Sequence, residues 1–406
     1  MQDERLGVAV VSRLFYPEYG GPGIALWRLL PGLRKRGFRF LVFARGRHDL
    51  PPDHRTEDIR ILRFGHPGGR SGEMRFILGT LLALWIHRGE YQVIHVYHSG
   101  WLTFLVPLLG KLLGKRAVFT ITLLDSDDPE AISRMQFAWI KLRLFSLYEK
   151  VISINPLMAA SYEKIYGPGD KLVVGCLGVD TDLFHPSTPE QRQKARQKLG
   201  LKKGQFIGVF LGAIIRRKGT DLVVETWLKL SHDLPKSLLL LIGPTEASGP
   251  TTSEDYNYEE LNQTIRDEGQ SERFHFAGMV TDRSRIVSFL HAADILLFLS
   301  RKEGTPTAVT EAMACGVVPV ISELEGFAGV VVHDGREGLV HADGVDLGDL
   351  AKRIAALAAQ PELMAGMGRH SVDVVAKGYS SRAAIEMLAG VWGGARSAHA
   401  PNKVST

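Results

Sequence analysis

Two glutamates bracket the start of a predicted helix in the second half of the chain. The segment from Glu303 to Glu311 reads EGTPTAVTE. We expect the N-cap at Thr305, the first helical residue at Pro306 and the helix end at Gly316, because hydroxyl, proline and glycine residues favour these positions. Glu311 would then lie about 9 Å beyond the cap. Two carboxylates so placed could bind hydroxyl groups at opposite ends of a diphosphate, whose charge the amides at the helix start would accept.

A basic triplet, Arg216-Arg217-Lys218, follows an apolar strand-like run at residues 206–211 and precedes a helical pattern. Cations at the carboxyl end of a strand, beside the start of a helix, are typical of a diphosphate-binding site. An exposed basic turn would have the same sequence, so both interpretations stay open at this point.

Glycines also follow the first strand-like run, in the order Tyr19-Gly20-Gly21-Pro22-Gly23. They allow close approach of the backbone, and the following helix start favours an anion. The run does not fit G-x-G-x-x-G, so a dinucleotide fingerprint is not supported. A turn in any α/β protein explains these glycines equally well.

Three aspartates, Asp125, Asp127 and Asp128, follow another strand-like run at 117–122 and contain the pattern Asp-x-Asp. We discount a metal site here, because Lys218 and a helix dipole already neutralise a diphosphate. We expect an acidic loop beside the substrate-binding site, or else a cluster of helix caps.

These residues need elements to position them, and short apolar runs alternate with helical patterns along the whole chain. Uniformly apolar runs of this length are typical of buried parallel strands. Strand–helix–strand repetition predicts an α/β fold with doubly wound sheets. The predicted strands are 8–11, 40–43, 59–64, 93–97, 117–122, 151–154, 172–174, 206–211, 238–242, 274–276, 295–299, 317–321 and 330–332.

A break at residues 184–189, which contains two prolines, divides this alternation in two. A length of 406 residues also exceeds what one core usually supports. We therefore predict two Rossmann-like doubly wound domains, residues 1–186 and 187–380, whose strand ends face a central cleft. We expect a helix at about 381–392 to pack back on the first domain, and the tail 393–406 to be disordered.

Composition excludes several classes of protein. The longest uncharged apolar stretch, 76–86, has about half the ~20 residues that a membrane-spanning helix needs. The first residues are acidic, which does not suit a signal peptide. Two cysteines, Cys176 and Cys315, cannot make a disulfide framework or a zinc cage, so we expect a cytoplasmic protein.

The positive charge lies in the first half of the chain. Residues 1–186 carry 24 Lys+Arg and 18 Asp+Glu, a net +6, and the remainder carries 49 − 24 = 25 against 44 − 18 = 26, a net −1. The first half thus suits an anionic partner, either a phosphorylated substrate or a membrane surface, unless it is simply a solvated face. The apolar segment 74–86, flanked by Arg70, Arg75, His87 and Arg88, could dock on a membrane or be a core helix.

Taken together, these motifs resemble those of the retaining glycosyltransferases of GT-B fold, specifically family 4 (glycosyl transferases group 1). Glu303 and Glu311 have the family's glutamate–seven residues–glutamate spacing, and residues 311–316, EAMACG, are close to its usual wording. Further matches occur in order along nearly the whole chain: Tyr19-Gly20-Gly21, the segment 178–184, Lys218-Gly219 and the segment 326–338.

The resemblance implies a role for each matching residue. Glu311 would bind the ribose of the nucleotide and Glu303 the donor sugar, while Lys218 would contact the diphosphate. The remaining donor contacts would come from the amides of Gly304 and Thr305, from Gly21 in the other domain, and from Met279 and Val280 along the base.

The sequence departs from the family pattern at two places. Ala213 stands where the family usually has arginine, and either Arg216 or Arg217 could replace it. The family's histidine after the strand ending near residue 120 is missing as well, and His98, at the end of the preceding strand, could fill part of that catalytic role beside Glu303 and Lys218.

The resemblance implies a retaining, metal-independent transferase without a cofactor, involved in cell-surface polysaccharide or glycoconjugate synthesis. The donor would be a nucleotide sugar, with UDP-sugars first and GDP-mannose second. The acceptor would be a glycan, a lipid-linked molecule or a small molecule, and we expect no nucleic acid partner. Peripheral contact with the inner face of the membrane would suit the basic first domain. A nucleotide-sugar epimerase and a catalytically weakened binding protein stay open as alternatives.

Overall fold

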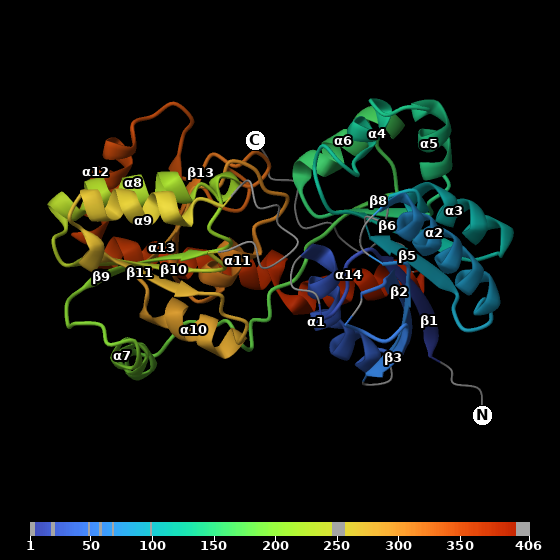
Figure 1. The fold of residues 1–406 in the computed structure, drawn as a ribbon, viewed down its shortest axis with the longest axis horizontal. Coiled ribbons are helices and arrows are strands. Elements are labelled where there is room, and N and C mark those ends of the chain that lie inside the picture. Colours follow the sequence, from blue (N-terminus) through green and yellow to red (C-terminus); the bar gives the residue numbers. More distant parts are fainter. Residues whose placement is uncertain are drawn as a thin grey trace. The chain divides into compact units, whose positions relative to one another are not determined.

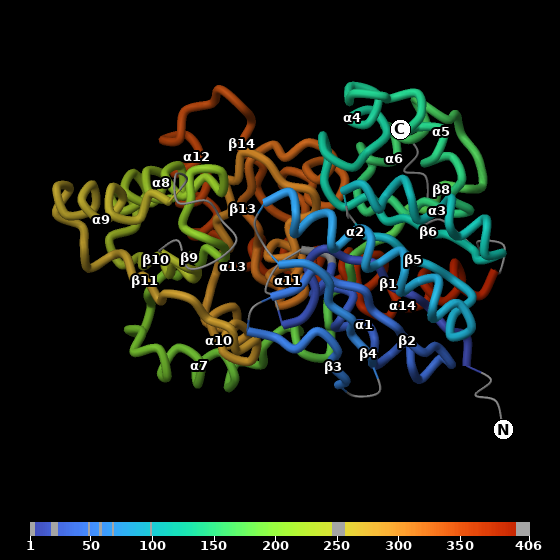
Figure 2. Tube along the Cα trace, turned by 45° about the vertical axis from the view of Figure 1, so that its right-hand side comes forward, coloured from blue at the N-terminus to red at the C-terminus, as the bar shows by residue number. Residues whose placement is uncertain are grey.

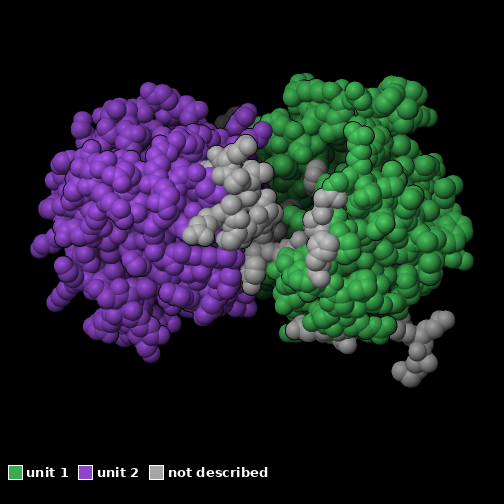
Figure 3. All heavy atoms as spheres, viewed as in Figure 1, with its two compact units in different colours: residues 1–178, 381–406 green, residues 179–380 purple. Residues whose placement is uncertain are grey.

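The computed structural model describes residues 5–17, 21–47, 49–56, 59–66, 69–97, 100–245 and 256–394. The chain forms two compact units, which Figure 3 colours separately. Unit 1 contains residues 1–178 and 381–406, and unit 2 contains residues 179–380. Within the described ranges, no helix is long and apolar enough to cross a membrane.

Unit 1 is built on an eight-stranded sheet with the order β3-β4-β2-β1-β5-β6-β7-β8. All pairs are parallel except β3 with β4. The central strand β1 is buried from Gly7 to Ser12, because successive apolar side chains such as Val10 and Val11 point to opposite faces of the sheet. The strands are β1 (Leu6–Ser12), β2 (Phe38–Arg45), β3 (Asp53–Thr56), β4 (Ile59–Phe64), β5 (Val93–Tyr97), β6 (Arg116–Ile121), β7 (Lys150–Ser153) and β8 (Leu172–Val174).

Helices cover both faces of this sheet (Figure 1). Helix α1 continues through Pro31, and α4 and α6 each begin with a proline directly after a side-chain cap, Asp128 and Asn155 respectively. The helices are α1 (Gly21–Lys35), α2 (Gly69–Ile86), α3 (Leu102–Leu112), α4 (Pro129–Ser133), α5 (Ala138–Phe145), α6 (Pro156–Tyr166) and α14 (Ser381–Gly393).

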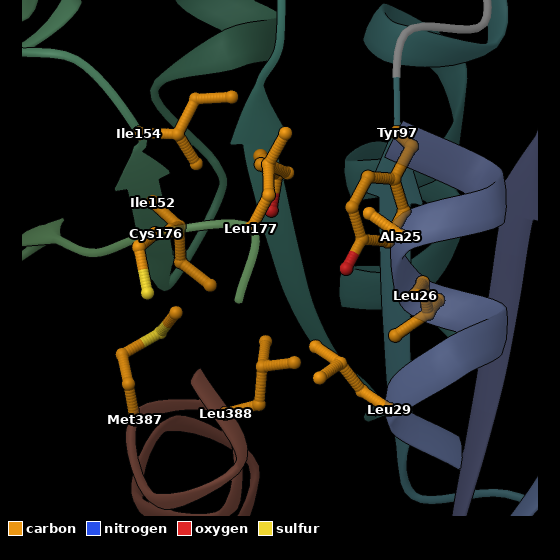
Figure 4. Close-up of a pocket in the computed structure, with 11 residues that line it drawn as sticks. Ala25, Leu26, Leu29, Tyr97, Ile152, Ile154, Cys176, Leu177, Met387 and Leu388 are labelled. Atoms are coloured by element: carbon orange, nitrogen blue, oxygen red, sulfur yellow. The ribbon is translucent and has the colours of Figure 1, made fainter. Parts of the chain in front are cut away.

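Helix α14 belongs to unit 1 although it lies at the far end of the sequence, and Figures 1 and 2 both place it beside α1. Met387 and Leu388 of α14 point toward Ile152, Cys176 and Leu29 of unit 1 (Figure 4), and the seam between them keeps a volume of only about 10 Å³.

Buried polar groups fix the end of α14. Trp392 Nε1 donates to His95 Nδ1 at 3.1 Å, and the other ring nitrogen of His95 lies 2.7 Å from Thr120 Oγ1. Because burial lowers the pKa of His95 to about 3, the ring is neutral, and its Nε2–H is the donor to Thr120. Arg116 donates to the backbone carbonyls of Trp392 and Val391 at 2.6 and 2.9 Å.

Unit 2 is built on a fully parallel six-stranded sheet with the order β11-β10-β9-β12-β13-β14. The chain starts in the middle at β9, moves outward through β10 and β11, then crosses to β12 and moves outward on the other side. The strands are β9 (Phe206–Leu211), β10 (Ser237–Ile242), β11 (Phe274–Gly278), β12 (Ile295–Phe298), β13 (Val318–Ser322) and β14 (Leu339–His341). The two doubly wound α/β units confirm the predicted fold class.

The helical elements of unit 2 enclose a single large core cluster. They are α7 (Pro189–Lys198), η1 (Arg216–Lys218), α8 (Thr220–Asp233), α9 (Tyr258–Asp267), η3 (Ser271–Arg273), α10 (Arg283–Ala292), α11 (Thr307–Ala314), α12 (Leu347–Ala358), α13 (Pro361–Val374) and η4 (Val375–Tyr379). The predicted strand at 330–332 is wrong, because these residues form turns and bridges before β14.

The division between the units lies earlier than the expected break at 184–189. Val179 already pairs with the end of unit 2, through a 2.7 Å hydrogen bond from its amide to the carbonyl of Tyr379. Phe184 is buried in the core of unit 2. The two prolines therefore mark the approach to α7, which starts with a capping box at Thr188, and not the boundary itself.

Candidate active site

The order of strands in unit 2 creates a switch point between β9 and β12. These two strands are parallel neighbours, and the connections that follow them run to opposite sides of the sheet. Ligands of doubly wound folds bind at the carboxyl ends of strands at such a point. Lys218 follows β9 and Glu303 follows β12, so the topology brings together residues 85 positions apart.

Lys218 and Glu303 form an ion pair at the switch point. The Lys218 ammonium donates to Glu303 Oε1 at 2.6 Å, and the two side chains are 20% and 11% exposed. The Ser300 hydroxyl donates to the same oxygen at 2.8 Å. Ser300 is itself held by Ser322, whose hydroxyl donates to the Ser300 carbonyl at 2.5 Å. The Glu303 carboxylate is thus fixed through one of its two oxygens.

Gly219 explains how η1 comes so close to the end of β12. Its φ is +66°, and a Cβ at this position would lie 1.7 Å from the carbonyl oxygen of Leu299. Any side chain here would push the turn, and with it Lys218, away from Glu303.

The two arginines beside Lys218 point to different partners. The Arg217 guanidinium lies 3.7 Å from Glu303 Oε1 and donates to the Lys302 carbonyl at 3.0 Å. Arg216 instead forms an ion pair with Glu260, and both of these side chains are more than half exposed. The structure therefore brings Arg217 to the Lys218–Glu303 pair and directs Arg216 away from it.

Helix α11 starts one residue later than expected. Pro306, with ψ +94°, is the N-cap residue, and Thr307 is the first residue of the helix, so the predictions of Thr305 as N-cap and Pro306 as first helical residue are wrong. Proline fixes φ but leaves ψ free, and the Pro306 carbonyl accepts from the amide of Val309 at 3.1 Å. The predicted end is confirmed, because Gly316 has φ +73°. The N–H groups of Thr307 and Ala308 have no acceptor within the helix.

Glu311 lies on α11 with only 13% of its side chain exposed. Arg283, the first residue of α10, donates to Glu311 Oε1 at 3.2 Å and stacks over the Phe184 ring at 4.7 Å. Sequence reasoning missed Arg283, because nothing in the local pattern links the start of α10 to a glutamate 28 residues later.

Met279 and Val280 directly follow β11. Met279 is 51% exposed, whereas Val280 is half-buried against the core of unit 2. Because β10 separates β11 from β9, the two residues lie two strands away from Lys218.

The other predicted site residues belong to unit 1. His98 lies outside the described residues, and Gly21 is the first residue of α1. Asp127 accepts hydrogen bonds from the amides of Thr122 and Leu123 and from the Thr122 hydroxyl, so its buried carboxylate stabilises its own loop.

The other two aspartates also have local partners. Asp128 caps α4 and accepts a 2.6 Å hydrogen bond from the Ser161 hydroxyl, while the exposed Asp125 lies 4.0 Å from Arg134. Among the described residues, no group of three or more His, Cys, Asp and Glu side chains is arranged to hold a metal ion.

Comparison with known proteins gives a consistent picture. A curated relative, D-inositol 3-phosphate glycosyltransferase 2 of Catenulispora acidiphila, is 29% identical over 321 residues, which cover 76% of this chain and 73% of that protein. Sucrose-phosphate synthase from Thermosynechococcus elongatus shares the fold with a TM-score of 0.77 at 20% identity, covering 96% of this chain and 99% of the other. Anabaena Alr3699/HepE, solved in complex with UDP-glucose, has a TM-score of 0.73 at 18% identity, with coverages of 96% and 100%.

Two family models match the chain one after the other. The model described as Glycosyltransferase Family 4 matches residues 19–183, and the model described as Glycosyl transferases group 1 matches residues 191–371. These matches contain both halves of the chain, including the Lys218–Glu303 pair. The chain is therefore a glycosyltransferase that belongs to the group 1 family with GT-B fold.

Proposed function

We propose that this glycosyltransferase moves a sugar from a nucleotide-sugar donor with retention of the anomeric configuration and without a metal ion. The observation that carries the proposal is the Lys218–Glu303 pair at the switch point of unit 2, with Arg217 beside it. The pair combines a cation for a diphosphate with a carboxylate for sugar hydroxyls.

The cations would stabilise the leaving group. Breaking the bond between the anomeric carbon and the phosphate oxygen leaves the nucleoside diphosphate with extra negative charge. Fixed donors aimed at such a developing charge lower the barrier, because they need no rearrangement during the reaction. Lys218 and Arg217 supply two cations, and the N–H groups at the start of α11 add partial positive charge.

Glu303 would orient the donor sugar. In the part of unit 2 that the structure describes, Oε1 takes the contacts from Lys218 and Ser300, and Oε2 makes no hydrogen bond. A carboxylate fixed through one oxygen can accept from a sugar hydroxyl through the other without losing its position. Glu311 would bind the ribose, with Arg283 orienting its carboxylate.

The comparisons suggest which donor and which acceptor to test first. The complex of the Anabaena protein with UDP-glucose supports a UDP-sugar as the first donor to test, with GDP-mannose second. The names of the curated relatives support a small phosphorylated acceptor, beside the glycan and lipid-linked acceptors expected from the family.

A peripheral position on the inner face of the membrane is part of the proposal. It is supported by α2, which buries Phe76 and Leu84 on one side and exposes Met74, Leu78, Leu82, Trp85 and Ile86 on the other. A helix with an unburied apolar side beside arginines suits an anionic lipid surface.

The test is a panel of nucleotide sugars and acceptors with the purified full-length protein. We expect release of nucleoside diphosphate that requires an acceptor, unchanged activity in EDTA, and by NMR a product with the anomeric configuration of the donor. Interconversion of donor sugars without an acceptor would instead indicate an epimerase, and tight donor binding without turnover would indicate a binding protein.

A matched pair of variants tests the site itself. Glu303→Gln removes the charge that holds Lys218 and should lower kcat/KM at least ~100-fold. Glu272→Gln removes the same charge from an exposed residue of η3 and should be silent. Full activity in Glu303→Gln would remove the pair from the mechanism.

A further inference from the structure

A pocket of 210 Å³ opens in unit 1, beside α3 and α5. It lies at the carboxyl ends of neighbouring strands, because residues 100–104 follow β5 and residues 126–127 follow β6. This is the edge of a doubly wound sheet at which ligands bind. An apolar cavity of about 150 Å³ can hold benzene, so this pocket has room for a ring or a short alkyl chain.

The walls of the pocket are mainly apolar and aromatic, with Trp101, Phe104, Ile132 and Met135 among the residues that line it. Trp101 is half-exposed, so its ring reaches from the pocket to the surface. The neighbouring Phe137 and Trp139 are more exposed still, at 66% and 72%. Large apolar side chains are thus exposed on the segment between the lining residues Met135 and Lys141.

One cation lies in this apolar surrounding. The half-buried Lys141 ammonium lies 5.0 Å from the Trp101 ring centroid and 5.6 Å from that of Phe104. Its hydrogen bond goes to Met135 Sδ at 3.6 Å, and a thioether is a weak acceptor. Across the described part of the chain, no carboxylate forms an ion pair with Lys141. A cation partly removed from water without a counter-ion favours an anionic ligand.

Asp127 also lines the pocket, but it forms no ion pair with Lys141. Its carboxylate is 4% exposed and accepts from the Thr122 amide, the Thr122 hydroxyl and the Leu123 amide at 3.0, 2.7 and 2.9 Å. No acidic residue occurs from 131 to 148, the segment that contains α5. The segment that carries Lys141 therefore contributes only positive charge to the pocket, beside the hydrogen-bonded Asp127 carboxylate.

We propose that this pocket binds an amphipathic anion, with an alkyl or aryl group between Trp101, Phe104 and Met135 and a phosphate or carboxylate on the Lys141 ammonium. The pocket lies at the ligand-binding edge of unit 1. We therefore assign the bound anion to the sugar acceptor, as a part of it that combines an apolar group with a phosphate or carboxylate. This identification of the ligand as acceptor rests on the proposed function, whereas the binding of the anion does not.

The test measures binding of octyl phosphate, below its micelle concentration, to the full-length protein by calorimetry without any nucleotide. Octyl phosphate should bind at least tenfold more tightly than octanol, octyltrimethylammonium or inorganic phosphate. Lys141→Gln should remove this preference, whereas Lys141→Arg should keep part of it. Trp101→Ala should lower the affinity for octyl phosphate at least threefold. Lys111→Gln, which removes the same charge from the exposed side of α3, should change the affinity less than twofold.

Equal binding of octanol and octyl phosphate, or unchanged binding in Lys141→Gln, would overturn the proposal. UDP binding, measured in parallel, keeps this outcome distinct from failure of the donor site in unit 2. Phosphatidylcholine vesicles with and without phosphatidic acid distinguish the source of the anion. A preference for phosphatidic acid that requires Lys141 would identify a membrane lipid, and octyl phosphate binding without that preference would identify a soluble amphiphile.

Discussion

Arg216 and Arg217 offer a matched pair of substitutions, because they are adjacent, equally charged and similarly exposed, at 54% and 46%. Only Arg217 approaches the Lys218–Glu303 pair, at 3.7 Å, and Arg216 pairs with Glu260. If the diphosphate binds at this pair, Arg217→Ala should weaken UDP binding and transfer, and Arg216→Ala should not.

The magnitude follows from distance and exposure. Two unit charges about 4 Å apart interact by about 1 kcal/mol in bulk water and about 4 kcal/mol at an effective dielectric constant of 20. A half-exposed guanidinium falls between these limits, so Arg217→Ala should lower kcat/KM about 10- to 50-fold. Lys218 is less exposed, so Lys218→Ala should lower kcat/KM at least ~100-fold. Arg216→Ala removes only a surface ion pair, which typically contributes less than ~1 kcal/mol to stability. The kcat/KM of this variant should therefore stay within about twofold of the unsubstituted enzyme.

The assay combines UDP affinity by calorimetry with the initial rate of nucleoside diphosphate release, and the melting temperature serves as the folding control. If Arg216→Ala lowered UDP affinity and the transfer rate as much as Arg217→Ala, the conclusion that only Arg217 contacts the diphosphate would be refuted. Full activity in Lys218→Ala would refute the role of the whole basic turn.

Four further substitutions or conditions test other parts of the structure. Glu311→Gln should weaken UDP binding by ~1–3 kcal/mol in calorimetry, and an unchanged affinity would remove Glu311 from the nucleotide site. Gly219→Ala should reduce both the urea midpoint of unit 2 and the activity, because its φ is +66° and its Cβ would overlap the Leu299 carbonyl; normal values would contradict the close approach of η1. Trp392→Phe leaves His95 Nδ1 without its donor and should cost ~1–3 kcal/mol in urea unfolding, whereas a change below ~0.5 kcal/mol would count against the bond. The unfolded chain protonates His95 below its ordinary pKa of 6.5 while the folded ring stays neutral down to about pH 3, so stability should fall by ~2 kcal/mol from about pH 7.5 to about pH 5, and less in His95→Gln.

The strands could be predicted from sequence because a strand buried on both faces is apolar throughout. The runs at 93–97 and 206–211 match β5 and β9 residue for residue. Strand β3, by contrast, was missed, since its sequence Asp-His-Arg-Thr is polar and it pairs only at the edge of the sheet. Edge strands bury little, so their sequences carry little signal.

The site could be predicted in its residue types but not in its contacts. Lys218 and Glu303 are identified by the motif, and the topology explains why they meet. Which arginine faces Glu303 depends on the backbone direction through η1, which adjacent identical residues do not reveal. The contact between Arg283 and Glu311 depends on where the tertiary fold places the start of α10, which has no local signature.

The discontinuity of unit 1 has a consequence during synthesis of the chain. The ribosome completes residue 178 about 200 residues before it completes α14, and at about 5–20 residues per second this interval lasts roughly 10–40 seconds. Throughout it, the surfaces of Ile152, Cys176 and Leu29 that α14 covers stay exposed, and His95 lacks its indole donor. Unit 2 is continuous in sequence and emerges whole in the same interval, so the nascent chain can finish its second unit before its first.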